Sequence, residues 1–175
     1  MSEIEILSQG KFLELKREGR WEYVSRRHAS GAVHILALTA QREIVLVEQE
    51  RVPVHARTIE LPAGVIGDEV AHRGESIETC ALRELMEETG YRGSEVRVIY
   101  SGPTAPGLTS EMVHLVRISK IEKIGDGGGV DGENITVHMV PLGEVDDWLE
   151  RRRADGLWPD PRIYAGLYFL LAGVA

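Results

Sequence analysis

Residues 64–91 constrain the fold of this chain more than any other stretch. Apolar side chains recur at helical spacing through residues 76–89, and Gly90 follows where a helix would end. Side chains three and four positions apart are neighbours on a helix, so three carboxylates share one face. These are Glu84, Glu87 and Glu88. The sequence therefore predicts a helix that packs on one side and is strongly acidic on another.

Three adjacent carboxylates repel one another, so this face needs either bulk water or bound cations. Hard cations such as Mg²⁺ and Mn²⁺ take oxygen ligands and would neutralise it. Spacing alone favours a solvated face, because acidic helix faces are common on protein surfaces. The residues around the helix change that balance.

The wider pattern resembles the Nudix box, the signature of hydrolases that cleave nucleoside diphosphates linked to another group. The residues that match it stand at the offsets of the box: Glu75, Arg83, Glu84, Leu85, Glu87, Glu88, Gly90 and Tyr91. One position departs from it, because Glu69 stands where the box has glycine. Gly64, in Leu61-Pro62-Ala63-Gly64, is the substitute, which implies five extra residues in the loop before Glu75.

Cleavage of a diphosphate requires activated water and neutralised phosphoryl charge, which bound divalent ions supply. Glu84 and Glu88 are the candidate ligands for Mg²⁺, with Mn²⁺ as the alternative ion and Glu87 as a third or outer carboxylate. The resemblance adds the backbone carbonyl of Ala63 to this set. Arg83 is expected to orient the carboxylates of the helix rather than to touch substrate.

The run Gly127-Gly128-Gly129-Val130-Asp131-Gly132 formally satisfies a dinucleotide-binding fingerprint. That interpretation fails, because residues 133–137 continue as a predicted strand, whereas the fingerprint must open a helix. A mobile loop is the expectation instead. Resemblance to Nudix ADP-ribose pyrophosphatases implies a loop acid here that enters the site as general base. Glu133 matches it best and Asp131 is the reserve, with an ordinary solvated acid as the alternative.

Three further features resemble the substrate-binding elements of those enzymes. Pro106 lies downstream of the box where they carry a characteristic proline. The segment with Trp21, Glu22 and Arg26 resembles the one that stacks adenine and contacts the nucleotide, although packing is as good an account of Trp21 alone. Arg51 matches an arginine placed on the diphosphate, where a charged fork suits phosphate oxygens.

Short apolar, β-branched segments predict strands, and the longer amphipathic segments predict helices. Strands are expected at residues 4–7, 12–15, 21–25, 32–38, 43–47, 58–61, 96–100, 112–118 and 135–140. Helices are expected at residues 76–89 and 142–154, and a last one after Asp160 and Pro161. The fold class is α/β. The resemblance implies a Nudix α/β/α sandwich with a mixed sheet over residues 28–175, preceded by a small antiparallel β unit over residues 1–27.

Composition excludes some functions. The formal net charge is −8 without a basic block, which argues against nonspecific nucleic-acid binding. The start of the sequence lacks a signal peptide, and the longest apolar stretch is too short to span a bilayer, so a cytoplasmic protein without membrane contact is expected. The resemblance also implies a homodimer in which the N-terminal β unit serves dimerisation and the adenine site.

The sequence thus predicts a Mg²⁺-dependent enzyme that splits ADP-ribose into AMP and ribose 5-phosphate. A different nucleoside diphosphate sugar, such as GDP-mannose, is the alternative substrate. A non-catalytic Nudix-fold sensor that binds ADP-ribose is the alternative from another class. The complete set of Arg83, Glu84, Glu87 and Glu88 argues against the sensor, which does not need a metal site.

Overall fold

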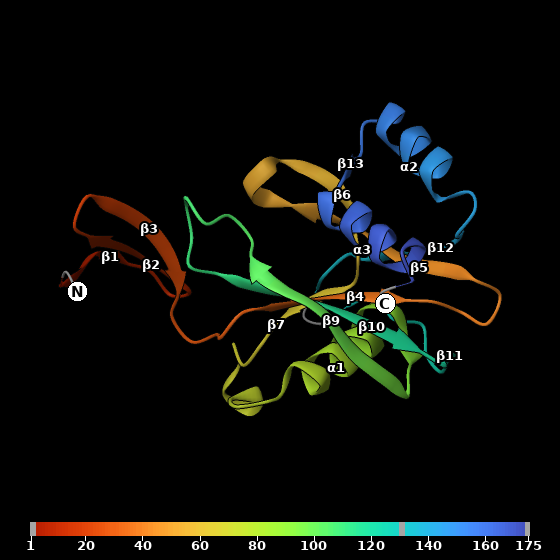
Figure 1. Cartoon of the computed structure of the whole chain (residues 1–175), viewed down its shortest axis with the longest axis horizontal. Coiled ribbons are helices and arrows are strands. Elements are labelled where there is room, and N and C mark those ends of the chain that lie inside the picture. The colour runs from red at the N-terminus through yellow and green to blue at the C-terminus, as the bar shows by residue number, and fades with distance from the viewer. Residues whose placement is uncertain (1–2, 130–131, 174–175) are drawn as a thin grey trace.

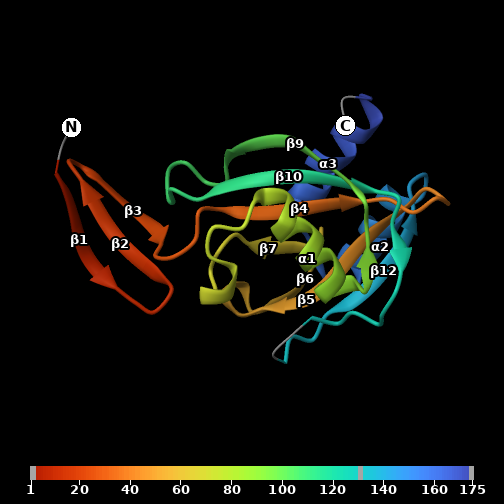
Figure 2. The same ribbon diagram turned by 90° about the horizontal axis from the view of Figure 1, so that it is seen from below.

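The computed structural model describes residues 3–129 and 132–173. Its first three strands form a separate antiparallel sheet that stands apart from the body of the molecule (Figures 1 and 2). They are β1 (Ile4–Gln9), β2 (Leu13–Glu18) and β3 (Trp21–Arg26). The predicted N-terminal unit is confirmed. It exposes large apolar side chains to solvent: Ile4, Ile6, Phe12, Leu13, Leu15 and Trp21.

The body contains two four-stranded sheets rather than one. The first sheet has the order β7 (Ala63–Val65), β4 (Ala32–Ala37), β10 (Met112–Ser119), β9 (Glu95–Pro103). The second has the order β12 (Thr136–Pro141), β5 (Glu43–Arg51), β6 (Ala56–Glu60), β13 (Trp158–Pro159). Each contains one parallel pair, β4 with β10 and β6 with β13, so both are mixed. The expected mixed sheet is present, divided in two.

One short pair of strands and two turns of 3₁₀ helix lie outside these sheets. The strands β8 (Tyr91–Arg92) and β11 (Glu122–Lys123) pair with each other beyond the end of the long helix. Two single turns of 3₁₀ helix, Val52–Val54 and Val70–His72, lie in the β5–β6 turn and in the loop after β7. The second of these turns lies in the loop before Glu75, for which the sequence predicted five extra residues.

The three helices form the outer layers. They are α1 (Ile77–Thr89), α2 (Val145–Ala154) and α3 (Pro161–Leu171). The helix α1 lies on one side of the sheets and α3 on the other (Figure 1), which confirms the α/β/α sandwich. Strand β4 serves both cores, because alternate side chains point to opposite faces. Val33 and Ile35 pack in the core under α1, whereas Leu36 packs in the core with α2 and α3.

Local sequence explains the limits of α1. The hydroxyl oxygen of Ser76 accepts a hydrogen bond from the backbone N–H of Thr79 at 3.1 Å, which is a normal N-cap. Gly90 ends the helix in the left-handed conformation that glycine adopts without strain. The predicted helix is therefore confirmed, and its C-terminal half is fixed beside strand β7.

In the described part of the chain, no helix has both the length and the apolar character that crossing a membrane requires.

Candidate active site

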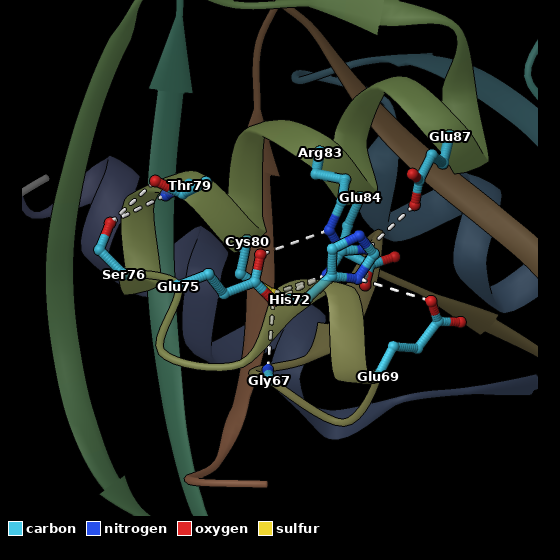
Figure 3. Close-up of polar contacts among 10 residues, drawn as sticks. All are labelled: Gly67, Glu69, His72, Glu75, Ser76, Thr79, Cys80, Arg83, Glu84 and Glu87. Atoms are coloured by element: carbon cyan, nitrogen blue, oxygen red, sulfur yellow. Dashed lines mark hydrogen bonds and ion pairs between the residues drawn. The ribbon is translucent and has the colours of Figure 1, made fainter.

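Arg83 organises the acidic face of α1. Its Nη1 donates hydrogen bonds to Glu84 Oε1 at 2.8 Å and to Glu87 Oε2 at 3.0 Å (Figure 3). Its Nη2 donates to Glu75 Oε1 at 2.9 Å, and the same oxygen accepts from the backbone N–H of Gly67 at 3.2 Å. This one guanidinium therefore orients two carboxylates of the helix and, through Glu75, ties the extended loop to it.

A cleft of about 500 Å³ opens where α1, the two main sheets and the start of α3 meet. Six residues selected from the sequence line it: Arg26, Arg51, Ala63, Glu84, Glu88 and Glu133. Seven carboxylates but only three arginines are among the described residues that line the cleft. This excess of negative charge would repel a diphosphate unless cations accompany it.

Glu88 is a buried carboxylate and Glu84 a partly buried one in the lining of the cleft. Glu88 is 5% exposed, and it accepts a hydrogen bond from the backbone N–H of Ala63 at 3.0 Å. Burial raises the pKa of Glu84 to about 7, against the opposing charge of Arg83. Burial also raises the pKa of Glu88 well above its usual range. Bound cations would offset both effects, because they stabilise the ionised carboxylates.

The donor set fits the expected metal. Carboxylate and carbonyl oxygens are the ligands that Mg²⁺ and Mn²⁺ prefer, and Mg²⁺ commonly keeps several waters and uses few protein ligands. Within residues 3–129 and 132–173, no three acidic, histidine or cysteine side chains already converge tightly enough to enclose an ion. Water and substrate oxygens would therefore have to complete the coordination of an ion held by Glu84 and Glu88.

Gly64 allows β7 to pass directly against this acidic pair. A Cβ built on Gly64 would lie 2.0 Å from the side-chain carboxyl carbon of Glu84. No other amino acid fits at that position without displacing Glu84. The glycine that substitutes for the missing box glycine is thus held in contact with a candidate metal ligand.

Arg51 lines the cleft in an orientation that Glu60 fixes. Its Nε and Nη2 donate hydrogen bonds to the two oxygens of Glu60, both at 2.7 Å, and Glu60 is 4% exposed. Burial alone would raise the pKa of Glu60, but the bonds from Arg51 and Thr58 outweigh it and lower that pKa. Three N–H groups of Arg51 remain available for phosphate oxygens.

The start of α3 supplies a second fixed arginine. Arg162 donates from Nε to Asp160 Oδ1 at 2.7 Å, and its Nη2 bonds the other oxygen of Asp160. Arg162 Nη1 lies 2.9 Å from His34 Nε2. Because a guanidinium only donates, Nε2 must accept, so His34 is neutral. Burial, followed by the charge of Arg162, accordingly lowers the pKa of His34 to about 4.

The remaining predicted residues lie elsewhere. Trp21 and Pro106 come together in a separate cavity of about 430 Å³ between β3 and the β9–β10 loop. Glu22 lies on neither cavity, and its closest ionic neighbour is Arg17 at 3.9 Å. Glu87 is turned to Arg83 and does not line the cleft. Asp131 lies outside the described residues.

Sequence reasoning missed several residues of the cleft. They are His34, Gln49, Glu60, Asp68, Glu111, Asp160 and Arg162. Asp160 was expected only as a helix cap, which it is, since its Oδ1 accepts the backbone N–H of Arg162 at 2.7 Å. Glu111 bonds Arg26 at 2.5 Å across a sequence separation that no local pattern reveals.

Comparisons with known proteins found relatives that match most of this chain. A family model described as the NUDIX domain matches residues 28–160. The methanol dehydrogenase activator of Bacillus methanolicus is 34% identical over 141 residues, which cover 81% of this chain and 72% of that protein. An ADP-ribose pyrophosphatase of Bacillus subtilis is 34% identical over 123 residues, covering 70% of this chain and 64% of that protein.

Two further matches extend over almost all of the chain. An ADP-sugar pyrophosphatase of Mus musculus is 31% identical over 186 aligned positions, covering 92% of this chain and 82% of that protein. A solved structure described as an ADP compounds hydrolase superposes with a TM-score of 0.74, covering 98% of this chain and 91% of its own. At 19% sequence identity, this last likeness shows the fold alone.

Proposed function

The chain belongs to the NUDIX family and is a Nudix pyrophosphohydrolase, and we propose that it hydrolyses ADP-ribose to AMP and ribose 5-phosphate. The observation that carries this proposal is the meeting of Glu84, Glu88, Arg51 and Glu133 in one cleft. That arrangement joins one buried and one partly buried carboxylate for cations, a fixed guanidinium for phosphate oxygens and a further acid. Relatives named as pyrophosphatases of ADP-ribose and of ADP-sugars support the choice of substrate.

The proposed metal is Mg²⁺, or Mn²⁺ in its place. Glu84, Glu88 and the carbonyl of Ala63 would hold it, with Glu87 as an outer carboxylate oriented by Arg83. When bound, such an ion neutralises phosphoryl charge and lowers the pKa of coordinated water.

The residues of the chain would then perform the proton transfer and the positioning. Glu133 accepts a proton from the attacking water while the water oxygen forms its bond to phosphorus. The bridging P–O bond breaks, and its electron pair stays on the oxygen of the departing phosphate. Arg51 holds the diphosphate through the N–H groups that Glu60 leaves available. Asp131 remains the reserve candidate for the base.

The N-terminal unit, residues 1–27, would bind the adenosine end and dimerise, and residues 28–175 would form the catalytic domain. Trp21 is 56% exposed and lines one cavity with Pro106, which suits stacking on a purine. Arg26 lines the catalytic cleft, and Glu22 is exposed on the same strand. The apolar side chains exposed on β1 and β2 favour coverage by a second subunit.

A substrate panel tests the proposal. The protein is incubated with Mg²⁺ and ADP-ribose, GDP-mannose or a UDP-sugar, and released AMP, GMP or UMP is quantified. We expect the highest kcat/KM for ADP-ribose. Faster release of GMP would assign the alternative substrate. Saturable binding of ADP-ribose without hydrolysis would identify the non-catalytic sensor.

A further inference from the structure

The beginning of the glycine run caps the C-terminal end of α1. The backbone N–H of Gly128 donates to the carbonyl of Glu88 at 2.8 Å, and that of Gly129 donates to the carbonyl of Glu87 at 3.1 Å. The last carbonyls of a helix have no partner within it, so these bonds satisfy groups that would otherwise need water. The two residues whose carbonyls accept these bonds, Glu87 and Glu88, also carry carboxylates of the candidate metal site.

Gly127 makes this close approach sterically feasible. Its φ of +71° is unfavourable for residues with a Cβ. A Cβ at Gly127 would also lie 2.4 Å from the carbonyl carbon of Thr89 and 2.7 Å from the backbone oxygen of Glu88. Those atoms belong to the helix backbone and cannot move aside. The chain is thus held directly against the end of α1.

Gly129 connects this contact to the candidate general base. A Cβ at Gly129 would lie 2.5 Å from Glu133 Oε2 and 2.7 Å from Glu133 Cβ. The side chain of Glu133 therefore packs over Gly129, and it lines the same cleft as Glu88. The position of Glu133 therefore depends, through Gly129, on the helix that carries the metal ligands.

We propose that Gly127, Gly128 and Gly129 form a clip on the end of α1 that positions Glu133 for proton transfer. This inference rests on the proposed function, and the three glycines are positioning residues that act through Glu133. The sequence predicted a mobile loop here. The structure instead attaches residues 127–129 to the end of α1.

Alanine substitutions within one run test the clip. Gly127→Ala should dislodge the run from α1, and Gly129→Ala should displace Glu133 directly. Each should lower kcat with little change in KM, by about 10- to 100-fold for a misplaced catalytic group. Gly125→Ala is the matched control, because a Cβ there meets no atom within 4 Å and its φ is not positive. Mn²⁺ affinity should stay near wild type in all three, whereas Gly127→Ala and Gly129→Ala should each lower the melting temperature, because alanine is strained at their positive φ.

A double-mutant cycle separates positioning from a general structural defect. If the clip acts through Glu133, adding Gly127→Ala to Glu133→Gln should lower kcat by less than about threefold, since coupled residues are not additive. Independent effects that multiply in the double variant would overturn the inference. A Gly127→Ala variant with wild-type kcat would overturn it as well.

Hydrogen exchange keeps this test separate from the proposed function. Amides of Gly128 and Gly129 should be protected in the wild type and should exchange faster in Gly127→Ala. If Glu133→Gln retains full kcat, Glu133 is not the base and the positioning role fails with it. If no panel substrate is hydrolysed, the proposed function fails. Unprotected amides in the wild type would show that the clip itself does not form.

Discussion

Gly64 contacts Glu84 so closely that the Glu84 side chain can keep its position only because Gly64 has no side chain. A Cβ on Gly64 would lie 2.0 Å from the carboxyl carbon and 2.1 Å from Cγ of Glu84. Because β7 pairs with β4, and Glu84 is also held by Arg83, neither partner has an easy alternative position. The strand glycine and the helix glutamate therefore form one unit of the cleft.

Gly64→Ala should disable the enzyme while leaving the fold intact. The added methyl must push the Glu84 carboxylate out of place, and displacement of a reacting or metal-binding group by about 1 Å costs roughly 100-fold in rate. Mn²⁺ affinity, measured by calorimetry, should fall together with kcat. Gly143→Ala is the control, since a Cβ at Gly143 meets open space. Wild-type Mn²⁺ affinity in Gly64→Ala would contradict this account.

Glu84→Gln and Glu88→Gln should each remove most activity, and EDTA should silence the wild type. Loss of a charged ligand weakens the binding of the metal ion. The bound ion supplies several kcal/mol of charge stabilisation in the transition state, which corresponds to about 100-fold or more in rate. In EDTA, Glu88→Gln should unfold at a higher temperature than wild type, because it removes a buried charge. Glu78→Gln, exposed in the first turn of the same helix, is the control. Near-wild-type turnover in both glutamine variants would refute the metal assignment.

The sequence was informative where structure is local. The limits of α1 depend on Ser76, on Gly90 and on apolar residues one turn apart, which act within a few positions. Because Glu84 and Glu88 lie on that single helix, predicting the helix also predicted their shared face. Strands β4, β5 and β10 were found for the same reason, through runs of buried β-branched residues.

The parts that could not be predicted depend on contacts between distant segments. His34 and Arg162 are neighbours because α3 returns to the end of β4, 128 positions later. Strands β7 and β13 contain three and two residues, which is too short for an alternating pattern, and they exist through pairing with β4 and β6. The division into two sheets depends on which strands pair, as β4 does with β10 and β5 with β12, and hydrophobic periodicity does not encode those partners.

Deleting residues 1–16 should weaken self-association and affinity for ADP-ribose together. The deletion removes β1 and four of the six residues of β2, including exposed Ile4, Ile6 and Phe12, whose burial between subunits would favour a dimer. Sedimentation and KM report the two effects. Leu171→Ser is the control, because Leu171 is 77% exposed on α3. A full-length protein that is monomeric at micromolar concentration, yet hydrolyses ADP-ribose efficiently, would defeat this expectation.

Arg51→Lys should raise KM for ADP-ribose by about 10- to 100-fold, the range expected for losing hydrogen bonds from a charged group. Lysine cannot reproduce the fork that bonds both oxygens of Glu60 while still facing a phosphate. The β5–β6 hairpin offers a matched control, since Arg57 bonds Glu48 at 2.6 Å with similar exposure but is absent from the described lining of the cleft. Arg57→Lys should therefore leave KM unchanged. If both lysine variants raised KM equally, the effect would come from the hairpin as a whole, and Arg51 would have no special place on the diphosphate.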